Sequence, residues 1–156
     1  MNKTGVIYGI NGPVVYLKGN TGFKMSEMVY VGKERLVGEV IALTKDTTTV
    51  QVFEETTGLK PGETVTASGD ALSVTLGPGI LNNIFDGIER PLSEIAKQSG
   101  KYISRGLTVD SLDTEKKWDV HVTVSEGEEL MGGAIIAETQ ETASILHKSM
   151  VPPNLT

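Results

Sequence analysis

Seven short apolar segments, spaced roughly 8–12 residues apart, limit most strongly what this chain can fold into. They occupy residues 1–76, and turn-forming Asn, Gly, Pro and Asp residues stand between them. In chain order the segments are GVIYGI, GPVVYL, EMVYVG, RLVGEVIAL, TTTVQVFE, ETVTA and LSVTL. Short strands at this spacing are typical of all-β barrels and sandwiches. The sequence therefore predicts a mainly β fold that begins with a six- or seven-stranded β-barrel over residues 1–76.

The fifth segment also predicts which side chains face the barrel core. Successive side chains of a β-strand point to opposite faces of the sheet. Val50 and Val52 therefore share one face. Thr49 and Gln51 share the other face with Phe53. We expect the two valines to lie in the core.

A short helical linker is predicted over residues 77–103, where the spacing of apolar residues changes to one, three and four. The apolar side of the first helix would consist of Ile80, Leu81, Ile84, Phe85 and Ile88. We expect Pro91 to end it, because proline lacks an N–H group and disfavours helix in the residue before it. A second short helix is predicted from Leu92 to Gln98, with Ser93 near its start and Gly100 just after its end.

Residues 104–156 are predicted to form part of a second β-rich domain. In WDVHVTVS, Trp118 and three valines alternate with polar residues, and AIIAET and SILHKSMV supply two further strands. A sheet this small leaves N–H and C=O groups at its edges without partners. We therefore expect this domain to be truncated, with its boundary to the linker between Gly100 and Asp113.

Composition excludes several classes of protein. With 156 residues, 38% of them hydrophobic, the chain can bury a core without metals or disulfides. A net charge of −6 and the lack of a Lys/Arg cluster argue against nucleic acid as a partner, since binding requires cations opposite the phosphates. No cysteine is present, and no apolar run approaches the roughly 20 residues of a membrane span. The lack of cysteine is compatible with a cytosolic protein, and we expect a soluble chain that does not insert directly into a membrane.

The stretch VFEETTGLKPGETV raises the question of a phosphate-binding loop. Such a loop requires G-x-x-x-x-G-K-[ST], whose N–H groups and lysine surround the phosphates. Here Gly58 and Gly62 stand one position too close, and Glu63 occupies the place of the lysine. Because a carboxylate would repel phosphate, we interpret Pro61-Gly62 as the corner of a turn between two strands.

LGPG, at residues 76–79, resembles the start of a G-x-G-x-x-G dinucleotide fingerprint. Asn82 stands where the third glycine is required, and Pro78 removes one of the N–H donors. A turn between a strand and a helix is the favoured interpretation.

The remaining polar residues predict no chemistry. His121 and His147 lie far apart without cysteine support, and His121 falls on the polar side of its strand. The carboxylates could form acid–base pairs by number alone, but beside Gly and Thr they are expected to be solvated rims of turns. They are Glu54, Glu55, Glu126, Glu128, Glu129, Glu138 and Glu141. No G-x-S-x-G motif is present. We predict no catalytic, cofactor-binding or metal-binding residue in this chain.

MGGAIIAETQET has the shape of half of a lipoyl- or biotinyl-type barrel. Those domains carry a modified lysine at the tip of a hairpin, whereas the nearby Lys148 lies in the following apolar stretch. A carrier function would predict a mass shift from modification of lysine.

Six motifs occur in one order and at one set of spacings: GPVV, EMVYVG, LVGEVI, VQVFEETTGLKPGETV, LSVTLGPGILNNIFDGIERPL and MVPP. This series closely resembles the N-terminal part of the catalytic A subunit (alpha chain) of vacuolar/archaeal-type rotary ATPases. The match is strong from about Gly5 to Leu92 and looser from Ser104 to Thr156. EETTGLKPGE and LGPGIL..IFDGI.RPL are its most specific pieces.

The resemblance implies an N-terminal barrel, a linker and a bulge insertion. The barrel would join other A and B subunits in a hetero-hexameric head, and the insertion would contact peripheral stalk subunits. ATP and magnesium would belong to a downstream nucleotide-binding domain of the parent subunit, so none of the family's active-site residues is assigned here. The parent would couple ATP hydrolysis or synthesis to proton or sodium transport, in a cytoplasmic head peripheral to the membrane. This segment alone is expected to lack ATPase activity. The alternative is a free-standing β-barrel that binds a ligand or a partner.

Overall fold

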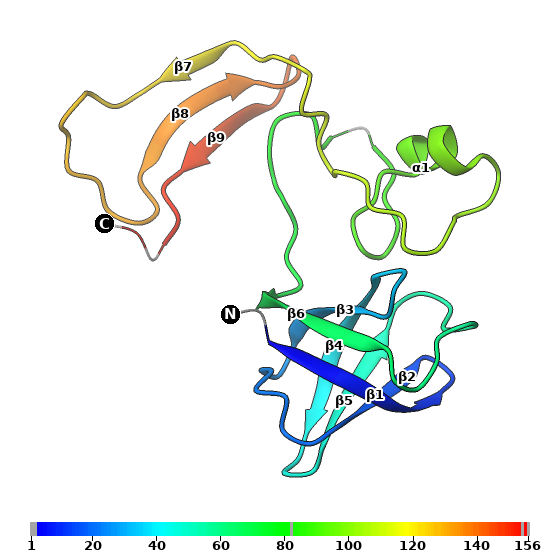
Figure 1. Ribbon diagram of the computed structural model, residues 1–156. Coiled ribbons are helices and arrows are strands. Elements are labelled where there is room, and N and C mark those ends of the chain that lie inside the picture. The colour runs from blue at the N-terminus through cyan, green and yellow to red at the C-terminus, as the bar shows by residue number, and fades with distance from the viewer. Residues whose placement is uncertain (1–2, 82, 154, 156) are drawn as a thin grey trace. The chain divides into compact units, whose positions relative to one another are not determined.

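The chain divides into two compact units in the computed structural model, which describes residues 3–81, 83–153 and 155 (Figure 1). The first unit comprises Met1–Val74 and Ile95–Thr108, and the second comprises Thr75–Glu94 and Val109–Thr156. The chain therefore passes from one unit to the other three times. The domain limits at residues 76 and 103 stay predictions from the sequence.

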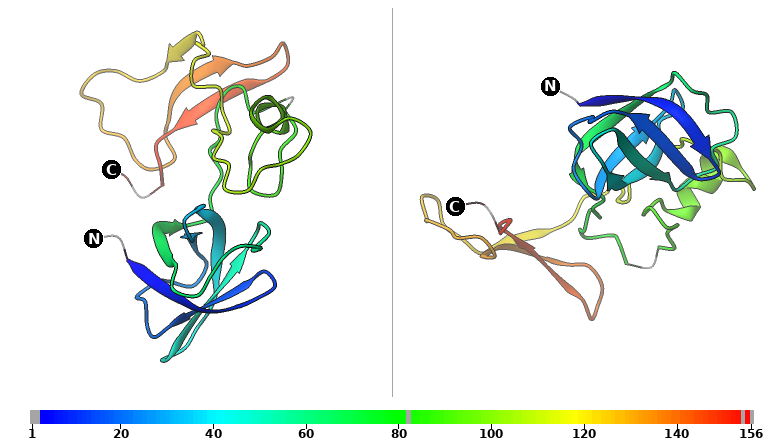
Figure 2. Two further views of the ribbon diagram at one scale, coloured as in Figure 1. Left: turned by 45° about the vertical axis from the view of Figure 1, so that its right-hand side comes forward. Right: turned by 90° about the horizontal axis from the view of Figure 1, so that it is seen from below.

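The first unit contains a closed barrel of six antiparallel strands (Figures 1 and 2). In chain order they are β1 (Thr4–Asn11), β2 (Val14–Lys18), β3 (Glu27–Val31), β4 (Leu36–Leu43), β5 (Thr47–Val52) and β6 (Thr64–Ala71). Around the barrel the order is β1-β2-β5-β4-β3-β6, and β6 pairs with both β1 and β3. The predicted mainly β fold and N-terminal barrel are confirmed.

Aliphatic side chains from all six strands fill the barrel. The buried cluster consists of Ile7, Val15, Leu17, Phe23, Val29, Val31, Leu36, Val40, Val50, Val52, Val65 and Ala67. Val50 and Val52 face inward as predicted, while Gln51 and Phe53 are exposed. Burial of each valine stabilises the fold by roughly 1.5–3 kcal/mol relative to an exposed side chain.

The predicted seventh strand, LSVTL at residues 72–76, is wrong. These residues are irregular, and Leu72, Val74 and Leu76 are exposed. The cause is the topology, because β6 already lies between β1 and β3 and the closed barrel offers no free edge to a further strand.

The predicted helix before Pro91 is also wrong. Residues 83–91 form a loop that is closed by an isolated bridge between Phe85 and Pro91. Inside it the Asp86 carboxylate accepts hydrogen bonds from the Ile88 N–H at 3.1 Å and the Arg90 N–H at 2.9 Å. It also accepts one from Arg90 Nε at 2.7 Å. An aspartate that binds nearby backbone N–H groups favours a turn over a helix, and the apolar spacing did not reveal this. Asn82 lies outside the described residues.

The second predicted helix is confirmed as α1 (Leu92–Ser99). The three predicted strands of the second unit are confirmed as β7 (Val120–Val122), β8 (Ile135–Gln140) and β9 (Leu146–Met150). They form one antiparallel sheet with β8 at its centre (Figure 2). Val120 and Val122 remain 54% and 63% exposed, so nothing in the described part of the chain covers that part of β7. Among the described residues, no helix is long and apolar enough to cross a bilayer.

Candidate interaction surfaces

Four neighbouring strands, in the order β6-β1-β2-β5, present an outer surface on which only the outward-facing residues Lys18 and Asp70 are charged. We name this surface the uncharged face and define it by ten uncharged outward-facing residues of these strands. They are Thr4, Val6, Tyr8, Val14, Tyr16, Thr47, Thr49, Gln51, Thr64 and Thr66. The registers place Val6 beside Thr64 and Tyr16 beside Thr49. Charge returns only at strand ends, with Lys18 and Asp70.

The uncharged face combines exposed apolar and aromatic side chains with threonines. Val6 and Tyr8 are 54% and 52% exposed, and the rings of Tyr8 and Tyr16 lie 6.2 Å apart. About a quarter to a third of an ordinary soluble surface is charged, whereas interface cores lose charge and gain tyrosine. An exposed apolar and aromatic area of this kind is typical of a surface that another protein covers.

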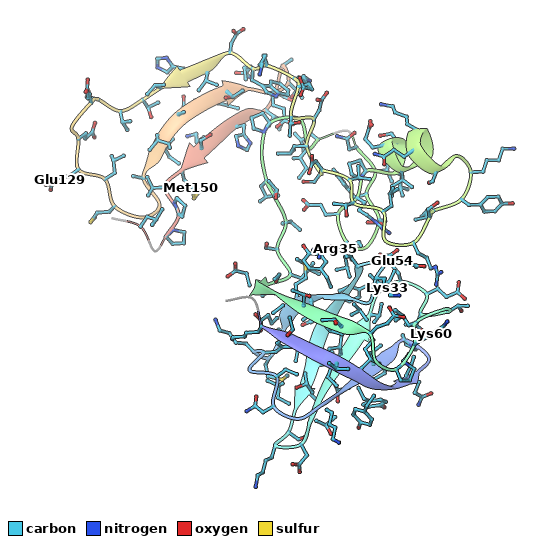
Figure 3. All side chains as sticks on the ribbon, in the orientation of Figure 1. Lys33, Arg35, Glu54, Lys60, Glu129 and Met150 are labelled. Atoms are coloured by element: carbon cyan, nitrogen blue, oxygen red, sulfur yellow. The ribbon has the colours of Figure 1, made fainter. Side chains whose placement is uncertain are left out.

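Charged residues gather instead at one end of the barrel. The β3–β4 turn and the loop of residues 53–63 meet there, and together we name them the barrel end. Figure 3 shows Lys33, Arg35, Glu54 and Lys60 on these two segments. The Arg35 guanidinium stacks over the ring of Tyr30 at 4.1 Å.

Glu63 joins the two segments of the barrel end. Its carboxylate accepts a hydrogen bond from the Lys33 N–H at 3.0 Å and another from the Lys60 N–H at 3.0 Å. Gly32 permits the close approach, since it has φ of +71° and a Cβ there would lie 2.6 Å from Glu63 Oε2. The residue at the position of a phosphate-loop lysine therefore holds two loops together.

Pro61-Gly62 is the corner of a turn between two strands, as expected, but the strands that EETTGLKPGE connects are not paired with each other. The loop does connect β5 to β6, but β5 pairs with β2 and β4, whereas β6 pairs with β1 and β3. Residues 53–63 therefore cross the end of the barrel from one side to the other. Pro61 and Gly62 do form a turn, and the Gly62 N–H donates to Ile7 O of β1 at 2.8 Å.

A groove of about 500 Å³ lies along this loop in the first unit. It is lined by Gly32, Lys33, Lys60, Pro61, Gly62, Glu63, Thr64 and Thr66. The N–H groups that would have to bind phosphate already bind the carboxylate of Glu63. This arrangement differs from a phosphate-binding loop, whose N–H groups are free to surround the phosphates.

Residues 104–107 lie against the barrel end, and we name them the strap. Arg105 Nη2 lies 3.2 Å from the carboxylate of Glu34 in the β3–β4 turn. Arg105 Nη1 donates to the carbonyl oxygens of Glu55 and Thr57. The next N–H, that of Gly106, donates to Glu54 Oε2 at 2.9 Å.

The two histidines do not form a site. His121 is opposite Glu138 and His147 is opposite Thr139, so their side chains lie on opposite faces of the sheet. Lys148 lies within β9 and pairs with Glu138 at 3.6 Å, whereas a lipoyl-type domain carries its lysine at a hairpin tip. Among the described residues, no three His, Cys, Asp or Glu side chains are grouped to hold a metal ion.

The LGPG loop also binds a carboxylate of its own chain. Glu141 Oε1 accepts hydrogen bonds from the Gly79 N–H at 2.8 Å and from the Leu81 N–H at 3.2 Å. Trp118 packs beside this loop, with Lys116 over its ring at 4.0 Å. Glu54 and Glu141, which the sequence suggested as solvated rims of turns, thus both bind backbone N–H groups.

Two family models match the chain. The model of the ATP synthase alpha/beta family beta-barrel domain matches residues 7–69, and that of the ATP synthase alpha/beta subunit barrel-sandwich domain matches residues 109–156. The chain therefore belongs to the ATP synthase alpha/beta family. Within that family, its sequence corresponds to the N-terminal part of the A subunit (alpha chain) of V/A-type ATP synthases.

Individual relatives match nearly the whole chain. The V-type ATP synthase alpha chain of Halothermothrix orenii is 52% identical over 155 residues, which are 99% of this chain and 26% of that protein. The A subunit of the A-type ATP synthase of Methanosphaera stadtmanae is 51% identical, over 97% of this chain and 26% of that protein. The V-type ATP synthase alpha chain 2 of Clostridium tetani is 50% identical, over 97% of this chain and 26% of that protein. The chain spans about a quarter of the length of these relatives.

Proposed function

We propose that this chain is the N-terminal segment of the catalytic A subunit of a V/A-type rotary ATPase. The parent complex would couple ATP hydrolysis or synthesis to proton or sodium transport, with ATP and magnesium bound outside this segment. The segment itself would serve assembly of the head and contact with a peripheral stalk. About 50% identity to such subunits over 95–99% of the chain supports the proposal.

The uncharged face of the barrel carries the assembly part of the proposal. Its partners would be the barrels of neighbouring A and B subunits in a hetero-hexameric head, which is soluble, cytoplasmic and peripheral to the membrane. A face with Val6 and Tyr8 half exposed gains free energy when an uncharged surface covers it. An acidic side chain buried in such a contact would lack a partner and would be strongly destabilising.

The first test is to read the gene beyond codon 156. An open frame that reaches a G-x-x-x-x-G-K-[ST] motif would support the proposal, because the nucleotide site would then follow this segment. A stop codon at that position would contradict it and leave a free-standing barrel that binds a ligand or a partner.

The second test addresses assembly of the full-length protein with its partner subunits. Tyr8→Glu should prevent formation of the hexameric head, observed by native mass spectrometry, while the circular dichroism spectrum of the full-length protein stays unchanged. Met25→Glu is the matched control, because Met25 is 56% exposed but lies outside the uncharged face. Normal assembly of the Tyr8→Glu variant would contradict the role of this face.

A further inference from the structure

The strap, residues 104–107, contacts both segments of the barrel end, which are the β3–β4 turn and the loop of residues 53–63. Arg105 contacts Glu34 of the β3–β4 turn and the carbonyl groups of residues 55 and 57. A guanidinium group can do this because its planar fork presents several N–H donors at once. A lysine at the same position would supply a single ammonium.

The backbone of the strap also lies directly on the barrel end. Gly106 has φ of +65°, and a Cβ on it would collide with the carbonyl oxygen of Glu34. Only glycine allows both this conformation and this approach. The Gly106 N–H points at the Glu54 carboxylate, at 2.9 Å. Arg105 and Gly106 are therefore both suited to contact with the barrel end.

The contacts of Arg105 and Gly106 are polar and partly exposed, and Leu107 at the end of the strap is half-buried. The side chains of Arg105 and Glu34 are 33% and 53% exposed, so water competes for their ion pair. Tyr102 and Ile103, which precede the strap, are exposed and add little apolar anchoring. A segment held in this way opens at a lower free energy than the strands of the barrel core.

The covalent path of the chain gives the strap a place in a conformational change. The strap ends at Leu107, and the first unit ends at the next residue, Thr108. The chain then enters the second unit at Val109. The residues that it holds, 54–57, belong to the loop that crosses the end of the barrel and lines the groove.

We infer that residues 104–107 are a releasable strap that restrains residues 54–57, the first part of the loop of residues 53–63, on the barrel. When the strap is docked, Arg105 and Gly106 hold the loop in the conformation described here. When it is released, the loop gains freedom while the barrel strands stay folded. This inference concerns a moving part of the chain and does not depend on the proposed function.

Amide hydrogen exchange of the whole chain, followed by NMR, tests whether the strap opens separately. The Gly106 N–H binds Glu54, whereas the Val52 N–H donates to Pro13 O at 2.8 Å inside the barrel. The opening constant of Gly106 should exceed that of Val52 by at least about tenfold. Equal opening constants would mean that the strap leaves only when the barrel unfolds, and would overturn the inference.

Variants test whether the strap controls the loop. Arg105→Ala should raise the exchange rate of the Leu59 amide, which bonds to Thr56 O within the loop, by about tenfold and leave Val52 unchanged. Arg105→Lys should give a smaller increase, because it keeps the charge but loses the fork. Arg35→Ala is the matched control, since the Arg35 guanidinium belongs to the same barrel end but stacks on Tyr30. An unchanged Leu59 rate in Arg105→Ala, or an equal increase in Arg35→Ala, would overturn the inference.

Discussion

Carboxylate side chains hold the irregular segments of this chain through backbone N–H groups. The buried Glu27 accepts from the Lys24 N–H at 2.6 Å, and Glu63 and Glu141 each accept from two N–H groups. A hydrogen bond to a charged group is stronger than one between neutral groups. Glutamates that resemble ordinary turn residues in the sequence therefore position loops in both units.

Asp86 also binds backbone N–H groups, and its hydrogen bonds predict that the stability of its loop depends on pH. Burial by itself raises its pKa. Hydrogen bonds from Arg90 and Ile88, together with the Arg90 charge, outweigh burial and hold the pKa below 3.8. Because the folded pKa is depressed, the stabilisation is present above the unfolded value of 3.8 and is lost as pH falls through the folded pKa.

We expect the Ile88 and Arg90 amide resonances to titrate together with a midpoint below 3.8, observed by NMR. Asp86→Asn should remove this transition and destabilise the loop at neutral pH, and the difference in stability should shrink at low pH. A midpoint at or above 3.8 would contradict the contribution of Arg90.

Val50 tests the assignment of the barrel core. Its side chain is 0% exposed, so Val50→Asp would place an unpaired charge in an apolar interior and should unfold the barrel. Val50→Ala should fold and lose about 2 kcal/mol of unfolding free energy, measured by urea denaturation. Gln51→Lys, on the neighbouring outward position opposite Glu39, is the control and should change stability by less than about 0.5 kcal/mol. Native circular dichroism and melting of Val50→Asp would show that the assignment is wrong.

The strands are the elements that the sequence predicts best. An apolar and polar alternation is a local property, so five of the barrel strands and all three strands of the second unit could be located from their own residues. Even the sixth, β6, was found in part, since ETVTA covers its first four residues. The alternation of Val50 and Val52 with Gln51 and Phe53 also gave the correct inward face.

The errors have two causes that apolar spacing does not show: closure of the barrel by distant strands, and the local hydrogen bonds of one aspartate. LSVTL has the alternation of a strand, but the barrel closes before it and leaves it no edge. The apolar spacing around Ile84 is helical, but Asp86 and Arg90 close a loop there. The candidate surfaces were less predictable still, because Arg105 meets Thr57 and Glu34 at separations of 48 and 71 residues. No local pattern indicates such a pair.

Glu63 contacts two segments, the β3–β4 turn and the loop of residues 53–63, so its removal should affect both. Removing its carboxylate should loosen both the β3–β4 turn and the loop of residues 53–63, since one N–H from each loses its partner. We expect Glu63→Ala to lower the unfolding free energy by about 1–2 kcal/mol, measured by thermal or urea denaturation. Glu55→Ala is the control, because that carboxylate bonds only to Thr57 of the same loop in the described structure. Equal losses in the two variants would show that Glu63 does not link the segments.

At the scale of the whole chain, the proposed function predicts that the purified protein does not hydrolyse ATP. In its groove Glu63 accepts hydrogen bonds from the Lys33 and Lys60 N–H groups, which a phosphate-binding loop would leave free. We expect no release of phosphate from ATP and magnesium above the rate in buffer, measured with a coupled assay. Turnover that persists through purification, and that a core variant such as Val50→Asp abolishes, would contradict the proposal.

The position of β6 between β1 and β3 has a consequence for synthesis on the ribosome. The barrel cannot close until translation has passed Ala71, which is 60 residues after the end of β1 at Asn11. At about 5–20 residues per second, the nascent chain therefore carries two unpaired strand edges for roughly 3–12 s. A ribosome that stalls in this interval would expose an open sheet with few charged side chains to its neighbours on the same messenger RNA. Chaperone capture of nascent chains should accordingly peak before β6 emerges and fall sharply afterwards.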